Sequence, residues 1–181
     1  MTAKRGLNRV GTPGTWEVIE RFPAHKAEIL ILVNPFSDGY IRYKLTIAEL
    51  GGPTTAAPLY MRFVNPTTYG GDNTHSYFVG GSSTEDGTEN KAYQSATDRF
   101  NVTGVNLGND IKIPQSITIN MAWQPTGIVT DWSGTVLDYD SNLYTIAGGG
   151  TCAAVDVTDI IFETASGCQF SGIFILEGLV A

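Results

Sequence analysis

Alternation of apolar and polar residues with a period of two constrains the fold of this chain more than any other feature. Residues 41–47, 59–63 and 117–123 each carry apolar side chains at every second position, which is typical of strands with one buried face. Helical periodicity is weak throughout, and the best helical candidate is a single turn around residues 89–95. Gly and Pro clusters bound the further strand candidates, which are residues 16–21, 27–33, 75–80, 99–105, 132–138, 142–147, 155–162 and 170–176.

The number of strands and the chain length together predict a fold class. A chain of 181 residues suits one domain and buries roughly 70% of its unfolded surface. About ten short strands at this length favour an antiparallel β-sandwich of the jelly-roll type over an immunoglobulin-type domain, which is nearer 100 residues. Residues 1–14 contain Gly and Pro without apolar alternation, so we expect an extended N-terminal arm followed by a single all-β domain over residues 15–181.

The C-terminal stretch is unusually apolar. From Asp156 the sequence reads DVTDIIFETASGCQFSGIFILEGL, which predicts a strand, a Ser166–Gly167 turn and a return strand paired with the first as a hairpin. The apolar residues of the return strand divide between two faces, with Phe170, Ile173 and Ile175 on one side and Phe174 and Leu176 on the other. An antiparallel sheet normally needs only one apolar face, so a second layer of the same fold or a neighbouring subunit must cover the other face.

These patterns carry a family resemblance. The C-terminal stretch, together with YIRYKL at 40–45, LYMRF at 59–63 and HSY at 75–77, resembles the small jelly-roll structural proteins of tailed bacteriophages. Glu177 and Cys168 depart from that pattern, where an aromatic and a small polar residue are usual. The resemblance implies a non-enzymatic virion protein assembled in the host cytoplasm, either a capsid decoration protein or a head spike. Its expected partners are further copies of itself, as a homotrimer, and other virion proteins such as the major capsid protein.

The charge pattern argues against two classes of partner. The net charge is −7 and the 11 basic residues are dispersed, whereas nucleic-acid binding requires clustered Lys and Arg. No apolar run approaches the roughly 18 residues of a membrane span, so we expect neither a nucleic-acid nor a membrane partner. Three basic residues gather in the arm. Together with two residues of the return strand they are the predicted assembly contacts: Lys4, Arg5, Arg9, Phe174 and Leu176.

Sequence motifs for catalysis or for a metal site are lacking. Neither a nucleophile elbow nor a zinc-binding or phosphate-binding motif occurs, and the acidic stretch at 138–149 lacks the Gly and Glu of an EF-hand loop. We therefore expect no enzymatic activity, no cofactor and no metal. Two cysteines without partner histidines do not make a zinc site, and Cys152 and Cys168 are expected to be reduced thiols.

A competing hypothesis keeps the fold but assigns a different role. Long polar loops at one end of a sandwich are common binding sites, so residues 65–74 and 81–91 could contact a host surface glycan if the protein lies at a tail tip. Trp123 has the parity of a core residue, which leaves Trp16 and Trp132 as the candidates for stacking on a sugar. The predicted loop-binding residues are Tyr69, Asp72, His75 and Trp132. A third hypothesis, a polysaccharide hydrolase, has no supporting carboxylate pair.

Overall fold

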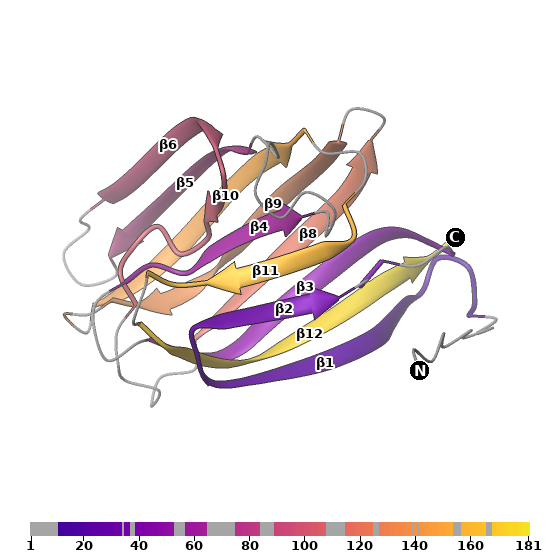
Figure 1. Cartoon of the computed structure of the whole chain (residues 1–181), viewed down its shortest axis with the longest axis horizontal. Helices are drawn as coiled ribbons and strands as arrows, with labels where there is room; N and C mark the ends of the chain where they lie inside the picture. Colours follow the sequence, from indigo (N-terminus) through magenta and orange to yellow (C-terminus); the bar gives the residue numbers. More distant parts are fainter. Residues whose placement is uncertain are drawn as a thin grey trace.

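The chain folds into two packed antiparallel sheets, as the computed structural model shows (Figure 1). It describes residues 11–33, 35–36, 39–52, 57–64, 75–83, 89–107, 115–124, 127–138, 140, 142–153, 157–165 and 168–181. The strands are β1 (Trp16–Ala27), β2 (Ile29–Val33), β3 (Tyr40–Gly51), β4 (Tyr60–Val64), β5 (His75–Ser83), β6 (Glu89–Thr97), β7 (Phe100–Asn101), β8 (Ser116–Gln124), β9 (Gly127–Leu137), β10 (Leu143–Cys152), β11 (Asp159–Glu163) and β12 (Phe170–Val180).

Eight of these strands trace a jelly roll. One sheet has the order β1-β12-β3-β8-β9-β10-β5-β6, and the other has the order β2-β11-β4-β7. The chain alternates between the sheets through β1, β2, β3 and β4, and again through β7, β8, β11 and β12, which is the double Greek-key path of a jelly roll. The remaining strands, β9, β10, β5 and β6, widen the larger sheet. The predicted all-β jelly-roll sandwich is confirmed.

The predicted C-terminal hairpin is wrong. β11 pairs with β2 and β4 in the four-stranded sheet, whereas β12 pairs with β1 and β3 in the eight-stranded sheet. The connection therefore crosses from one sheet to the other. Thr164 supports this crossing, because its Oγ1 donates to the carbonyl of Cys168 at 2.8 Å and its N–H donates to the carbonyl of Glu28 at 3.4 Å.

The two faces of β12 also differ from the expected division. Phe170, Phe174 and Leu176 are all fully buried on the face toward the four-stranded sheet. Phe174 contacts Phe162 of β11, with ring centroids 4.9 Å apart. Ile173 and Ile175 lie on the opposite face and are half-buried. The predicted face of Phe170 is thus wrong, because strict alternation places residues 170, 174 and 176 together.

Two further expectations are corrected. Residues 89–95 form part of β6, which pairs with β5 over Tyr77 to Ser82, and not a helical turn. Strand pairing overrides weak local propensity here. Of the predicted strand 99–105, only Phe100–Asn101 pairs, as β7.

Part of the predicted N-terminal arm lies outside the described residues. The described part, residues 11–14, is tied to the end of β12, because the N–H of Gly14 donates to the carbonyl of Val180 at 3.0 Å. Both cysteines are buried, and no disulfide joins them.

The burial of Tyr77 in the core predicts that the stability of the folded protein depends on pH. Burial, and to a smaller extent repulsion from Tyr60, raises the pKa of the Tyr77 hydroxyl above 10.0. The folded protein therefore holds this proton more tightly than the unfolded chain does, so the stabilisation is complete below pH 10 and is lost as the pH rises through the folded pKa. We expect the free energy of unfolding to fall more between about pH 9 and about pH 11 in the native protein than in a Tyr77→Phe variant. Urea titrations at both pH values measure this; equal losses would contradict the assignment.

Candidate functional site

Five of the residues predicted to bind partners lie outside the described residues. They are Lys4, Arg5 and Arg9 of the arm and Tyr69 and Asp72 of the loop at 65–74. The predictions for these residues remain predictions.

The other two predicted loop-binding residues are buried in the core. His75 lies in β5 rather than in a loop, and its Nε2 accepts a hydrogen bond from the N–H of Phe63 at 3.2 Å. Its ring packs edge-on against Phe100, with centroids 4.7 Å apart. Trp132 lies in the middle of β9, is 2% exposed and also packs against Phe100. Neither side chain can contact a ligand at the surface, so the prediction for both is wrong.

The predicted assembly contacts in the C-terminal strand are corrected as well. Phe174 and Leu176 have no exposed surface, because they fill the space between the two sheets. The chain's own second sheet covers them, so no neighbouring subunit is needed for this face of β12.

The acidic turn after β9 has a structural role. The Asp138 carboxylate accepts hydrogen bonds from the N–H of Asn142 at 2.7 Å and from its side-chain Nδ2 at 3.2 Å. These bonds join β9 to β10. Among the described residues there is no cluster of three or more His, Cys, Asp or Glu side chains that could hold a metal ion. The same residues include no helix long and apolar enough to cross a membrane.

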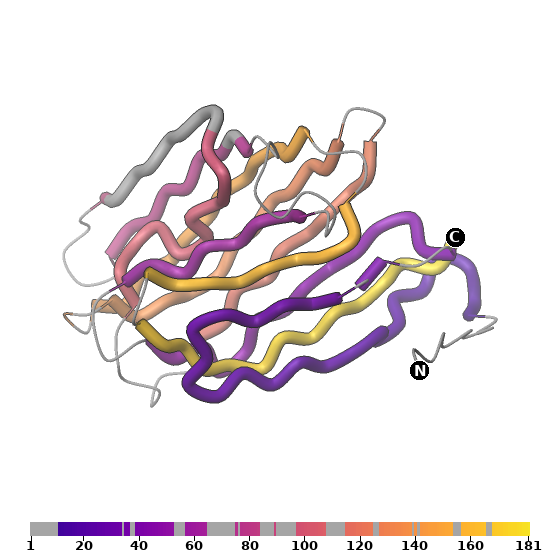
Figure 2. The backbone as a smooth tube through the Cα atoms, viewed as in Figure 1, coloured from indigo at the N-terminus to yellow at the C-terminus, as the bar shows by residue number. Residues whose placement is uncertain are grey.

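One sheet edge exposes an uninterrupted apolar strand, here called the β2 edge. β2 reads ILILV and pairs only with β11 among the described residues, so its other side offers unpaired backbone N–H and C=O groups. Its outward side chains are Ile29, Ile31 and Val33, which are 53%, 41% and 63% exposed. Figures 1 and 2 show β2 along the side of the molecule that it shares with β1. Such an edge is a template for pairing with another strand.

The neighbouring edges are protected and the β2 edge is not. β1, the edge of the larger sheet, has two register shifts, a proline at Pro23 and a left-handed Lys26 with φ of 48°. Its other exposed residues include the charged Glu20 and Arg21. At the far end of the smaller sheet, β7 is only two residues long. Bulges, proline, charges and short strands all discourage edge pairing, and β2 has none of them.

A charged cluster on the smaller sheet lies next to β2. Glu163 lies opposite Ile29 in the strand pairing. Its carboxylate oxygens form ion pairs with the guanidinium nitrogens of Arg62 at 3.4 Å and of Arg99 at 3.2 Å. The Arg99 guanidinium also stacks on Tyr60, 4.2 Å from the ring centroid. These contacts hold Glu163 and both arginines on the smaller sheet, beside the apolar row of β2.

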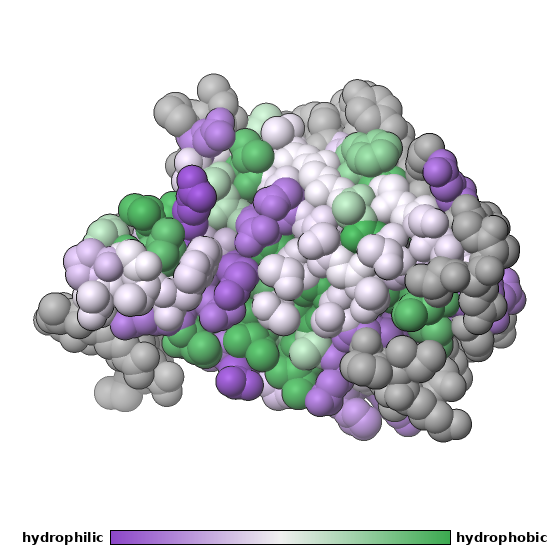
Figure 3. Space-filling model, turned by 180° about the vertical axis from the view of Figure 1, so that it is seen from behind, coloured by the Kyte–Doolittle hydropathy of each residue, from purple (hydrophilic) through white to green (hydrophobic). Residues whose placement is uncertain are grey.

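The outer face of the eight-stranded sheet has a different character. Figure 3, the view from behind, shows neutral groups over its middle, a band of hydrophilic groups and several hydrophobic patches. The strand registers place its outward residues in rows. One row runs Val18, Glu177, Lys44, Asn120, Asp131 and Gly149, and the next runs Arg21, Ile175, Thr46, Thr118, Ser133 and Ala147. Small and hydroxyl-bearing side chains of the second row, Thr46, Thr118, Ser133 and Ala147, therefore lie along one side of a narrow polar band.

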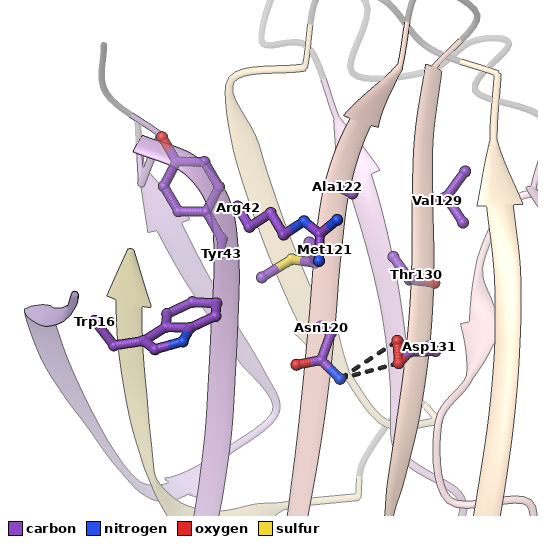
Figure 4. A pocket seen from close by; sticks show the side chains of 9 residues that line it. All are labelled: Trp16, Arg42, Tyr43, Asn120, Met121, Ala122, Val129, Thr130 and Asp131. Atoms are coloured by element: carbon purple, nitrogen blue, oxygen red, sulfur yellow. Dashed lines mark hydrogen bonds between the residues drawn. The ribbon is translucent and has the colours of Figure 1, made fainter. Parts of the chain in front are cut away.

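A groove crosses this face, here called the Trp16 groove (Figure 4). Its volume is about 350 Å³, and its lining comes from β1, β3, β8 and β9: Trp16, Arg42, Tyr43, Asn120, Met121, Ala122, Val129, Thr130 and Asp131. Asn120 Nδ2 donates to both carboxylate oxygens of Asp131, at 2.9 and 3.3 Å. The Trp16 indole is 41% exposed, and the Lys44 ammonium lies 5.0 Å from its ring centroid.

The stacking candidates are partly reassigned. Trp16 is exposed as expected. Trp123 follows the core-facing side of β8, yet it is 37% exposed where the strand ends, and its ring meets Phe36 with centroids 4.2 Å apart. Of these three tryptophans, Trp16 lines the groove on the outer face.

Comparison with known proteins adds no family. No protein-family profile matches the chain, and no curated protein sequence matches it.

Proposed function

We propose that this chain is a non-enzymatic structural protein of a bacteriophage particle, a capsid decoration or head-spike protein that assembles as a homotrimer. The observation that carries the proposal is the β2 edge, whose apolar side chains and unpaired backbone groups are exposed together. The sequence resemblance to small jelly-roll virion proteins supports the phage assignment.

The physical argument concerns the state of the isolated chain. Three exposed branched side chains on an unprotected edge are unfavourable in water and invite uncontrolled pairing. In a symmetric assembly each copy covers that edge, because the same patch recurs on every subunit. In a cyclic trimer the β2 edge of every copy is covered by a neighbouring copy. An arrangement without closed symmetry would instead add further copies and grow into filaments.

The proposal places the protein on the phage particle after assembly in the host cytoplasm. Its partners there are further copies of the chain and a shell protein such as the major capsid protein. Residues 1–14 supply the proposed anchor, with Lys4, Arg5 and Arg9 as its charged contacts. The trimer itself depends on the β2 edge and not on the arm, so the two contacts are separable.

Substitution of Ile31 tests the proposal. Lysine at position 31 introduces a charge in the middle of the β2 edge, where natural edge strands use lysine to block pairing. We expect Ile31→Lys to shift the protein from trimer to monomer in light scattering, without loss of the circular-dichroism signal of the fold. The matched control is Ile41→Lys, since Ile41 is also an exposed isoleucine, 59% exposed, but lies in β3. A trimer that survives Ile31→Lys, or that is lost equally in Ile41→Lys, contradicts the role of the β2 edge.

A further inference from the structure

We propose that the Trp16 groove binds a neutral saccharide. This inference does not depend on the assembly proposal, because the groove lies on the outer face of the eight-stranded sheet and the β2 edge belongs to the other sheet.

The groove combines an apolar floor with an aromatic wall. Ala122 and Val129 lie side by side on the outer face, and Val129 is 36% exposed. The Trp16 indole stands at the β1 end (Figure 4). A sugar ring presents C–H groups on its faces and hydroxyls around its rim, so a flat aromatic ring beside a short apolar surface matches the faces of such a ligand.

The indole is held in place before a ligand arrives. Lys44 lies over the Trp16 ring, and its Nζ is fixed by an ion pair with Glu177 Oε2 at 2.8 Å. That pair neutralises the Lys44 charge while restraining the ring. A restrained platform loses less conformational freedom on binding than a mobile one does.

The polar side chains supply both donors and acceptors for hydroxyl groups. Asn120 uses its amide nitrogen on Asp131, which leaves its carbonyl oxygen and further lone pairs of the carboxylate as acceptors. Arg42 is exposed and forms no ion pair in the part of the chain that the structure describes, so within these residues no carboxylate competes with a ligand for its guanidinium. Hydroxyls both donate and accept, which suits this mixed set.

The charges around the groove favour a neutral saccharide over an acidic one. Arg42 and Asp131 contribute one charge of each sign, and Lys44 and Glu177 cancel one another. The carboxylate of an acidic sugar would be attracted by Arg42. It would also be repelled by Asp131 and by the overall negative charge of the protein, which is −7. The groove's volume of about 350 Å³ lies at the small end of ordinary ligand pockets, which suits a short stretch of a glycan chain.

A glycan array followed by calorimetry tests the inference. The probe is an array printed with neutral oligosaccharides of glucose, galactose, mannose and N-acetylhexosamines, together with sialylated and uronic-acid glycans. We expect the intact protein to bind neutral glycans. With the strongest neutral array ligand in titration calorimetry, Trp16→Ala and Asp131→Ala should each weaken binding by about tenfold or more.

The control and the contradicting results are specific to the groove. Trp123→Phe changes the other partly exposed tryptophan and should leave the affinity unchanged, and melting curves confirm that each variant is folded. Binding to no neutral glycan, or to acidic glycans alone, overturns the ligand class. Binding that survives both groove substitutions, or that Trp123→Phe reduces equally, overturns the site.

Discussion

Phe174→Ala is expected to lower the free energy of unfolding by about 3–5 kcal/mol, the usual range for removing a buried phenylalanine. Phe174 has no exposed surface, and its ring packs against Phe162 of the opposite sheet at 4.9 Å and against Phe170 at 5.9 Å between centroids. Removing it leaves a cavity at the contact between the two sheets. Chemical denaturation followed by circular dichroism gives the change directly.

The matched control for this prediction is the next residue. Ile175 lies on the opposite face of the same strand and is half-buried, so Ile175→Ala should cost about 1 kcal/mol, well below the value for a buried isoleucine. If Phe174→Ala left the stability unchanged but dissociated the trimer, the placement of Phe174 in the core would be wrong and its predicted role as an assembly contact would be restored.

Gly134→Ala is expected to have the second large effect, a loss of about 3 kcal/mol, which corresponds to a fall in melting temperature of roughly 6–12 °C. A Cβ at this position would lie 2.1 Å from the carbonyl oxygen of Ser116 and 2.7 Å from the Cα of Ile117. Both atoms belong to the backbone of β8, which cannot move aside without disturbing its pairing with β9. Glycine in a strand often marks such a close approach.

Ser133→Ala serves as the control for Gly134→Ala. Ser133 precedes Gly134 in β9 and is exposed on the outer face. The melting temperature of the Ser133→Ala variant should therefore stay within a few degrees of the native value. A Gly134→Ala variant with the same melting temperature as the native protein would contradict the close approach of β8 to β9 at this point.

The sequence was a good guide to strands that have one buried face. Alternation predicted β3, β4 and β8 because their inward and outward residues differ in polarity. It failed for the pairing of β11 with β12, since a tight turn does not reveal whether the chain stays in one sheet or crosses to the other. It also failed for β6, where Glu89–Thr97 carries mostly polar and small residues and the strand depends on hydrogen bonds from β5.

Errors at the predicted binding residues have a related cause. The predicted strand 132–138 starts at Trp132, but β9 begins at Gly127, so the tryptophan lies in the middle of the strand with its side chain in the core. His75 begins the predicted strand 75–80, but its polar side chain groups it with the binding residues of the preceding loop; it is the first residue of β5 and is fully buried. A shift of a few residues in a strand boundary changes which residues are available at the surface.

The two candidate surfaces depend on tertiary information. The ILILV run of β2 looks like a strand buried on both faces, and only the sheet order shows that it lies at an edge. The Trp16 groove combines residues from β1, β3, β8 and β9, which are far apart in the sequence. No local pattern links Trp16 to Arg42 or to the Asn120–Asp131 pair, so residue spacing alone could not have identified the groove.

The mass of the purified native chain in solution tests the central proposal most directly. Multi-angle light scattering at micromolar concentration should give three times the mass of the chain, and dilution should leave that value unchanged over the range of the measurement. A stable, soluble monomer at the same concentration would show that the β2 edge is tolerated in water without a partner, which contradicts the assembly role.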